Sequence, residues 1–474
     1  MTDLPGGWVG ATMTELSSDS GYGTSAKCGY EESGIGVLRI PNVQKGSIDL
    51  ADLKRAPKSL ELNDHLRLRA DDLLLVRTNG SRDLIGRCAP VTQDLDYSFA
   101  SYLIRFRMRS EVVDTRFVSW MLSSPTWRER LEEAAASSAG QYNLSLRTLG
   151  PLPVVVPPLA EQERIVAAIE EAFSKLDAGE AGLRTVRQLL KRMRDAVLAA
   201  AVTGRLVPQN PTDTPAAKLL AGLGVEALDS PVLGPLPELW AWASMGDVTV
   251  IGGGIQKQPK RAPANNPTPF LRVANVGRGT LDLDDVHSIE VFDGELDRYG
   301  LERGDLLVVE GNGSPDQIGR SAMWHGEIDP CVHQNHLIRV RPSEVLLPEF
   351  LELYWNSPDA SRRVQSVASS TSGLHTLSTG KLKVLPVAIP PPEEQVRIVS
   401  EVDRQVSFLD ACEQGVDDGR ACAAALRRSV LKAAFEGNLV SQDPSDEPAS
   451  VLVERIRADR AAAPRAPRRS RRPA

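Results

Sequence analysis

The sequence has little cysteine, few aromatic residues and no long hydrophobic run. Its 474 residues include five cysteines and six histidines, and only 5% are aromatic. An odd number of cysteines without paired spacing argues against a disulfide framework and favours reduced thiols in a cytoplasmic protein. No run of about 18 apolar residues occurs, and no basic segment leads an apolar one at the N-terminus. We therefore expect no signal peptide, no membrane span and no membrane partner.

The sequence also has no excess of positive charge. Its formal net charge is −7, with 55 Lys and Arg against 62 Asp and Glu. A DNA-binding protein needs local positive potential rather than net positive charge, so this balance does not exclude DNA binding. It does predict weak binding by the isolated chain, with basic surfaces of partner subunits contributing.

Motifs for catalysis are missing too. There is no GxxxxGK[ST] loop, and the glycine run 252–254 lacks the lysine and hydroxyl that such a loop requires. The segment NPTPF, residues 266–270, departs from the Asn-Pro-Pro-aromatic signature of amino-methyltransferases. Cys331, His333 and His336 could bind a metal ion, although the first half of the chain has no counterpart. We predict a binding protein with no catalytic residue, metal or cofactor of its own.

What the sequence does contain is an internal duplication. The segment LPVVVPPLAEQERIV, residues 152–166, returns as LPVAIPPPEEQVRIV, residues 385–399, 233 residues later. The same offset relates the Asn-Gly-Ser of residues 79–81 to that of residues 312–314. Because few net insertions separate the copies, the two halves are predicted to share one fold.

Each copy begins with a mixed module of short strands, loops and helix, which predicts an α+β fold. The predicted strands are 73–76, 101–108, 305–309 and 337–340, and the predicted helices are 115–133, interrupted at Pro125, and 350–364. A linker with a short helix follows the first long helical region, and a second short helix with an arginine-rich tail ends the chain. The predicted segments are 1–157, 158–210, 211–235, 236–391, 392–440 and 441–474.

The segments after the proline runs have helical spacing. Apolar residues recur there at alternating steps of four and three, which is typical of a coiled-coil seam. The second seam is smaller and less regular, which indicates that it needs a partner. We predict that helices 158–204 and 392–437 pair antiparallel, the alternative being two unrelated surface helices. The predicted seam residues are Ile165, Ile169, Leu176, Leu183, Leu190, Val197, Ile398, Val402, Leu409, Leu426 and Val430.

Several motifs together carry a resemblance to a known family. They are paired LPxxW module starts, LP…PP…EQ…IV hinges, long helices ending in AAVTGRLVP and AAFEGNLVS, and DxPA segments. This set resembles the specificity subunit of type I restriction–modification systems. The resemblance implies two target recognition domains, each reading one half of a split, asymmetric DNA site, and an antiparallel helical spacer between them.

The same resemblance implies the partners. They are double-stranded DNA, two modification subunits that use S-adenosylmethionine to methylate adenine, and two restriction subunits that act as ATP-driven motor nucleases. The cofactors S-adenosylmethionine, Mg²⁺ and ATP would then belong to the partner subunits. One alternative is a coiled-coil scaffold that joins proteins without reading DNA. Another is the specificity chain of a related methyltransferase that lacks a motor subunit.

Candidate DNA contacts lie in and between the repeated Asn-Gly and Ile-Gly-Arg motifs, where the intervening polar residues of the two copies differ, and in a basic cluster that only the second copy contains. Arg, Asn and Gln are the side chains that make bidentate contacts to guanine and adenine edges. The candidates are Arg77, Asn79, Arg82, Arg87, Lys257, Lys260, Arg261, Asn312, Gln317 and Arg320. Asn79 and Asn312 precede glycine, so each could instead serve a turn.

Overall fold

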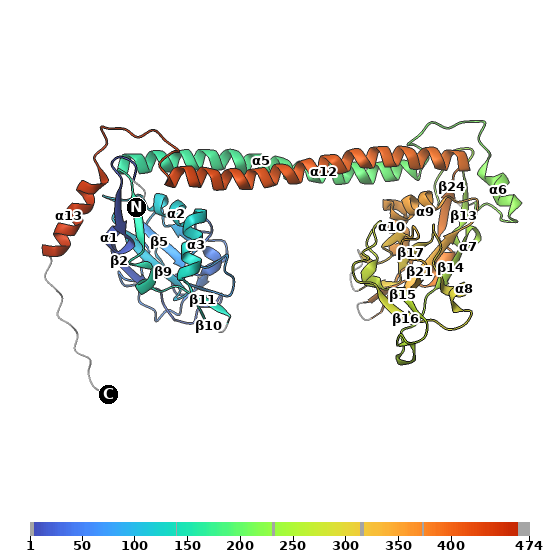
Figure 1. The fold of residues 1–474 in the computed structure, drawn as a ribbon, viewed down its shortest axis with the longest axis horizontal. Coiled ribbons are helices and arrows are strands. Elements are labelled where there is room, and N and C mark those ends of the chain that lie inside the picture. The colour runs from blue at the N-terminus through green and yellow to red at the C-terminus, as the bar shows by residue number, and fades with distance from the viewer. Residues whose placement is uncertain (1–3, 139, 230–232, 313–316, 372–373, 463–474) are drawn as a thin grey trace. The chain divides into compact units, whose positions relative to one another are not determined.

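The computed structural model describes residues 4–138, 140–229, 233–312, 317–371 and 374–462 (Figure 1). The chain divides into two compact units. Unit 1 comprises residues 1–183 and 418–474, and unit 2 comprises residues 184–417. Each unit therefore combines one module with the first part of one long helix and the last part of the other.

The module of unit 1 is built on small sheets. An antiparallel sheet has the order β2-β9-β5-β7, formed by Ser17–Tyr22, Leu103–Met108, Asp72–Val76 and Cys88–Pro90. The sheet β4-β3-β8 joins Lys54–Arg55, Gly36–Leu38 and Tyr97–Phe99. The remaining sheets are β1-β12, from Val9–Thr12 and Pro153–Val156, and β10-β11-β6, from Ala136–Ser138, Gln141–Asn143 and Thr78–Asn79.

The module of unit 2 repeats these strand orders. The sheet β14-β21-β17-β19 is formed by Thr249–Gly253, Leu337–Pro342, Leu306–Val309 and Ser321–Met323. The sheet β16-β15-β20 joins His287–Glu290, Pro267–Leu271 and Val332–His333. The others are β13-β24, from Ala241–Ser244 and Pro386–Ile389, and β18-β23-β22, from Gly311–Asn312, Leu374–Thr376 and Ser369–Thr371.

Helices cover the sheets in both modules. The break predicted at Pro125 separates α2, Thr115–Ser123, from α3, Pro125–Ala134. The single helix predicted at 350–364 is wrong, because the chain forms α9, Pro348–Asn356, and α10, Pro358–Val367. Ser357 between them is extended, with ψ of 153°, since a residue before proline is pushed out of the helical region.

The remaining helical elements are short, apart from the one that follows α12. They are α1 (Met13–Leu16), η1 (Ile40–Asn42), α4 (Leu146–Leu149), α6 (Ala216–Gly222), α7 (Met245–Val248), η2 (Pro259–Arg261), η3 (Val273–Asn275), α8 (Glu295–Tyr299), α11 (Thr379–Lys383) and α13 (Ala449–Ala462). The short helices expected after each long helix correspond to α6 and α13.

The two long helices pack together and run antiparallel in each unit (Figure 1). They are α5, Leu159–Ala201, and α12, Pro392–Phe435. In unit 1, Arg427 of α12 pairs with Asp177 of α5 at 2.7 Å. In unit 2, Arg187 of α5 pairs with Asp417 of α12 at 3.4 Å, and Arg194 pairs with Asp410. Residue numbers thus rise along one helix as they fall along the other.

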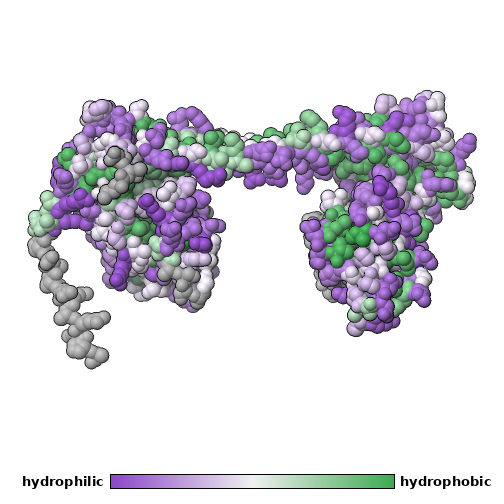
Figure 2. Space-filling model, in the orientation of Figure 1, coloured by the Kyte–Doolittle hydropathy of each residue, from purple (hydrophilic) through white to green (hydrophobic). Residues whose placement is uncertain are grey.

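The burial of the predicted seam is uneven. Leu190 and Leu409 are buried, whereas Leu426 is 48% exposed. Leu431 is buried in the core of unit 1 in its place, because the last part of α12 turns this face toward the module. Apolar side chains also remain exposed elsewhere on the helices, and Figure 2 shows hydrophobic stretches on their surface. The ends of the seam enter the module cores, where Ile165, Ile169, Ile398 and Val402 are buried.

The duplicated motifs meet where each long helix begins. The Trp8 indole N–H donates to Glu161 at 3.0 Å, and the Trp240 indole N–H donates to Glu394 at 2.9 Å. The next residue, Gln162, accepts from the backbone N–H of Asp114 at 2.9 Å. The LPxxW start and the EQ hinge are therefore two parts of one joint between module and helix.

The DxPA segments complete this joint. In unit 1, Arg164 of α5 pairs with Asp446 at 2.6 Å, in the segment that follows α12. In unit 2, Arg397 of α12 pairs with Asp213, in the segment that follows α5. Each helix start is thus held by the stretch of chain that follows the other helix, which explains why the motifs occur twice.

Candidate nucleic-acid interface

The first group of candidate residues lies at the end of β5 and along β6. Arg77 donates through Nη2 to Asn143 Oδ1 at 3.1 Å, and its guanidinium lies 4.5 Å from the centroid of the Tyr22 ring. The strand pairing places Tyr142 opposite Asn79. The fold therefore brings two of the predicted residues beside a polar strand that is distant in the sequence.

Arg82 lies close to the same strand. Its side chain is 60% exposed, and its guanidinium lies 5.7 Å from the centroid of the Tyr142 ring. Its contact with Glu132 is long, at 3.9 Å. An exposed cation beside an aromatic ring and amide side chains can contact phosphates and base edges. We define the β6–β11 edge as residues Arg77, Asn79, Arg82, Gln141, Tyr142 and Asn143.

The role of Asn79 within this edge is partly local. Its Oδ1 accepts a hydrogen bond from the backbone N–H of Ser81 at 2.8 Å, which is the turn role that its position before glycine predicts. Gln141, Tyr142 and Asn143 were missed by sequence reasoning. The signal that could have found them is the contrast between QYN at 141–143 and LHT at 374–376.

The counterpart in unit 2 is the pairing of β18 with β23. Asn312 lies opposite His375 in this sheet. Residues 313–316, part of the Asn-Gly-Ser repeat, lie outside the described residues, as does the side chain of Asn312. Gln317 is exposed and accepts a hydrogen bond from Arg320 at 3.3 Å.

Arg87 and Arg320 stabilise turns within their own modules. Arg87 Nη2 donates to the carbonyl of Ile40 at 2.9 Å, and burial lowers the pKa of its guanidinium. Arg320 donates to the carbonyls of Val276 at 2.7 Å and Val273 at 2.9 Å. Both side chains thus hold the turns η1 and η3, which leaves their guanidinium groups poorly placed for DNA.

The basic cluster of unit 2 surrounds η2. Lys257 and Lys260 are exposed, and Lys257 lines an open cavity of about 560 Å³ with Gln258. Arg261 differs, because its side chain is only 12% exposed and pairs with Glu295 at 2.7 Å. That ion pair holds the pKa of Glu295 at about 2. Arg261 therefore fixes the loop, and the two lysines are the accessible charges.

The three residues considered as metal ligands lie in different surroundings. Cys331 is buried, which raises the pKa of its thiol to about 12. His333 is buried 3.1 Å from the carbonyl of Leu337, and burial lowers its pKa to about 4. His336 is exposed and lies 3.2 Å from Glu310. Across the described part of the chain, no three His, Cys, Asp or Glu side chains are grouped to hold a metal ion.

The structure records all five cysteines as free thiols. Within the described residues, no helix is both long enough and apolar enough to span a membrane.

Comparison with known proteins finds similar chains. The chain is 28% identical over 476 residues to the type I restriction enzyme EcoKI specificity subunit of Escherichia coli K12, covering 97% of each chain. It is 30% identical over 345 residues to the type I restriction enzyme EcoBI specificity subunit of Escherichia coli, covering 69% of each chain. No family model matches the sequence.

A solved structure shares the fold. It is a chain of a type I R-M system, studied for complex assembly and conformational transition, and it aligns with a TM-score of 0.64. The alignment covers 92% of this chain and 100% of that chain, at 18% sequence identity.

Proposed function

Because the chain belongs to the specificity subunits of type I restriction enzymes, we propose that its two modules are target recognition domains that each read one half of a split DNA site. The chain is the DNA-recognition subunit of such a system and carries no catalysis itself. The domains proposed for this reading are residues 1–157 and 236–391.

One observation supports the proposal that the two modules read different halves of the DNA site. The two modules have the same strand orders, but the residues along equivalent edges differ. Gln141-Tyr142-Asn143 beside β6 corresponds to Leu374-His375-Thr376 beside β18. Two similar frames with different reading edges are what an asymmetric, bipartite DNA site requires.

The residues proposed to read bases are chosen by two properties. These are the exposure of the side chain and the hydrogen bonds or ion pairs that it already makes with protein atoms. In unit 1 the exposed candidate is Arg82 on the β6–β11 edge. Arg77, whose guanidinium already donates to Asn143, and Asn79, which serves its turn, are retained for their place on the same edge. In unit 2 the exposed candidates are Lys257, Lys260 and Gln317, with Asn312 retained from its strand position. Arg87, Arg261 and Arg320 support the frame, because their guanidinium groups already bind protein atoms.

The helices supply the spacer in this proposal. The proposed spacer is the antiparallel coiled coil of α5 with α12, which lie within the regions 158–210 and 392–440. The proposed linker is 211–235, and the proposed helix and tail are 441–474. Arg465, Arg468 and their neighbours in the tail lie outside the described residues. The joint formed by Trp8, Glu161 and Asp446 then sets the orientation of the first module on the helix.

The proposed partners are double-stranded DNA, two modification subunits and two restriction subunits. S-adenosylmethionine, Mg²⁺ and ATP would be bound by those subunits, in the cytoplasm. The formal charge of −7 supports a role for these partners in DNA binding. Because the chain has no excess of Lys and Arg, basic surfaces of the partner subunits would neutralise most of the DNA phosphates.

Methylation mapping tests the proposal. The chain is co-expressed with its modification subunits in a host without adenine methylation, and the methylated positions are sequenced. One split motif with adenine methylated in both halves is expected. Methylation of an unsplit motif, or none in a complex that assembles, would contradict the proposal. Adding the restriction subunits then distinguishes a complete system from a methyltransferase without a motor.

A further inference from the structure

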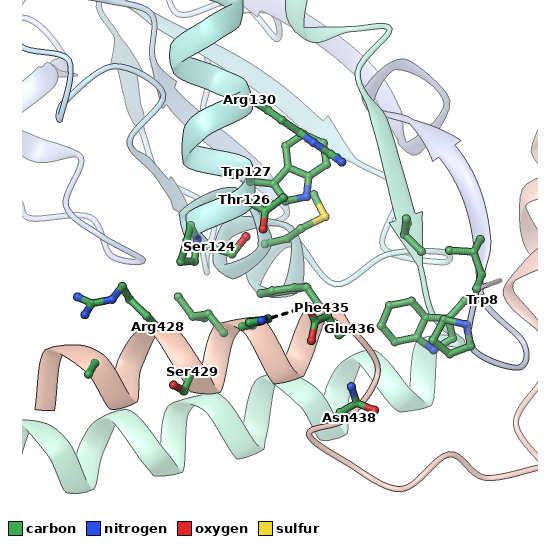
Figure 3. A pocket seen from close by; sticks show the side chains of 18 residues that line it. Trp8, Ser124, Thr126, Trp127, Arg130, Arg428, Ser429, Phe435, Glu436 and Asn438 are labelled. Atoms are coloured by element: carbon green, nitrogen blue, oxygen red, sulfur yellow. Dashed lines mark ion pairs between the residues drawn. The ribbon is translucent and has the colours of Figure 1, made fainter. Parts of the chain in front are cut away.

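Unit 1 contains a cavity that is lined by none of the residues proposed to read DNA. It has a volume of about 750 Å³ and lies between α3, the last part of α12 and the N-terminal segment (Figure 3). Trp127, Phe435 and Met121 provide its apolar floor. Trp127 is 5% exposed and Met121 is 2% exposed, so these side chains belong to the module core and form a firm surface.

The rim of the cavity is cationic. Arg130, Arg428 and Lys432 line it, and Glu436 is the acidic residue among the lining side chains. Glu436 lies 3.9 Å from Lys432, and the guanidinium of Arg130 lies 5.3 Å from the centroid of the Trp127 ring. No described carboxylate lies within ion-pair distance of Arg130 or Arg428. The rim therefore has an excess of positive charge that a ligand can neutralise.

A buried hydroxyl in the cavity has no hydrogen-bond partner. Ser124 is 3% exposed, and its Oγ makes no hydrogen bond within the described structure. Figure 3 shows this hydroxyl on the cavity side, between α3 and Phe435. Its equivalent in unit 2, Ser357, donates to the carbonyl of Tyr354 at 2.6 Å and accepts from the N–H of Ala360. Buried polar groups are normally satisfied, so this hydroxyl is a donor that a ligand in the cavity can engage.

Three of the lining residues have no similar counterpart in unit 2, whereas Arg130 is matched by Arg363. The 233-residue offset relates Trp127 to Ala360, Arg428 to Asp195 and Lys432 to Ala199. A bulky aromatic and two cations are thus replaced by two small residues and an acid. The duplication preserves the frame and one arginine at this place, but it does not preserve the aromatic side chain of Trp127 or the two cations of α12.

We propose that this cavity binds an acidic segment of a partner protein that inserts one large apolar side chain between Trp127 and Phe435. Carboxylates of the segment face Arg428 and Lys432, and a backbone carbonyl accepts from Ser124 Oγ. Charge complementarity selects acidic residues, while the apolar floor selects one buried anchor, as at protein–protein hot spots. A bare phosphate backbone would leave the floor unfilled, so DNA fits less well.

Photocrosslinking in the assembled complex tests this inference. Thr126, exposed at the rim, is replaced by p-benzoylphenylalanine in the full chain, and the complex with its modification subunits is irradiated without DNA and with DNA. We expect a crosslink to one partner segment that contains acidic residues around a large apolar residue. A crosslink to DNA, to a basic segment or to this chain itself, or no crosslink in an intact complex, would overturn the proposal.

A double variant shows whether the cavity itself is responsible. Arg428→Asp with Lys432→Ala installs the residues that α5 carries at the equivalent positions, so the helix should tolerate both changes. We expect the crosslink yield to fall at least tenfold. Arg420→Ala, an exposed arginine of α12 outside the cavity, is the matched control and should leave the yield unchanged. An unchanged yield in the double variant would also overturn the proposal. A gel shift with target DNA on the same complexes separates this outcome from failure of DNA reading.

Discussion

The indole N–H of Trp8 donates a hydrogen bond to the carboxylate of Glu161, 3.0 Å away, and so ties the start of the first module to the first turn of α5. Glu161 is 1% exposed. Trp240 and Glu394 make the same contact in unit 2 at 2.9 Å. A carboxylate buried at the joint makes the stability of that joint sensitive to pH.

The first prediction follows from the titration of Glu161. Burial raises the pKa of this carboxyl, and the hydrogen bond from Trp8 only partly offsets the shift. The native state therefore holds the proton more tightly than the unfolded chain, whose carboxyl titrates near 4.3. Its contribution to stability is complete below that value and is lost as the pH rises through the raised native pKa.

Glu161→Gln removes this titration. We expect the free energy of unfolding of the wild type, relative to the variant, to fall as the pH is raised from about 4 to 7, as measured by urea unfolding. Glu163→Gln, on the exposed side of the same helical turn, controls for the general loss of a carboxylate. If the difference in free energy of unfolding between the wild type and Glu161→Gln stays constant over this pH range, the raised pKa of Glu161 is contradicted.

The second prediction concerns the helix pair. Leu190 is 5% exposed, whereas its neighbour Leu189 is 54% exposed. Leu190→Asp would bury a charge without a partner, and we expect it to destabilise unit 2 by roughly 3 kcal/mol or more. Leu189→Asp places the same charge in solvent and should cost less than about 0.5 kcal/mol. Equal losses of melting temperature in the two variants would show that the pair does not pack as described.

The third prediction distinguishes an arginine that contacts DNA from an arginine that stabilises the module. Arg82→Ala removes an exposed cation from the β6–β11 edge, so we expect roughly tenfold or more weaker binding of target DNA by the assembled complex and an unchanged melting temperature. Arg87→Ala removes the hydrogen bond to Ile40, so the melting temperature should fall. Gel shifts and thermal denaturation of both variants check this. Loss of DNA affinity in Arg87→Ala alone, without destabilisation, would reverse the assignment.

Much of the architecture could be predicted because the sequence repeats its signals. The hinge at 152–166 and its copy at 385–399 marked the start of both long helices, and the break at Pro125 was visible as a proline within a helical pattern. The break at Pro358 obeys the same rule, but the apolar pattern of residues 350–364 concealed it.

The candidate interface was harder to predict because it depends on pairing between distant residues. The strands β6 and β11 are only two and three residues long and lie more than 60 residues apart, so no local pattern predicts that Tyr142 faces Asn79. Arg87 and Arg320 were chosen for their residue type alone. Their role became visible only when the structure placed them against η1 and η3. Leu426 fits the heptad, yet it is exposed because the module competes for the buried face of α12.

The central claim is that each module reads its own half of the DNA site, and an exchange of residues 1–157 with the equivalent module of a relative tests it most directly. The exchange leaves the joint residues Glu161 and Asp446 in place, so the complex should assemble. Methylation-motif sequencing should then show one half-site replaced by that of the relative and the other half-site unchanged. A motif in which both halves change, or neither changes, would contradict the account.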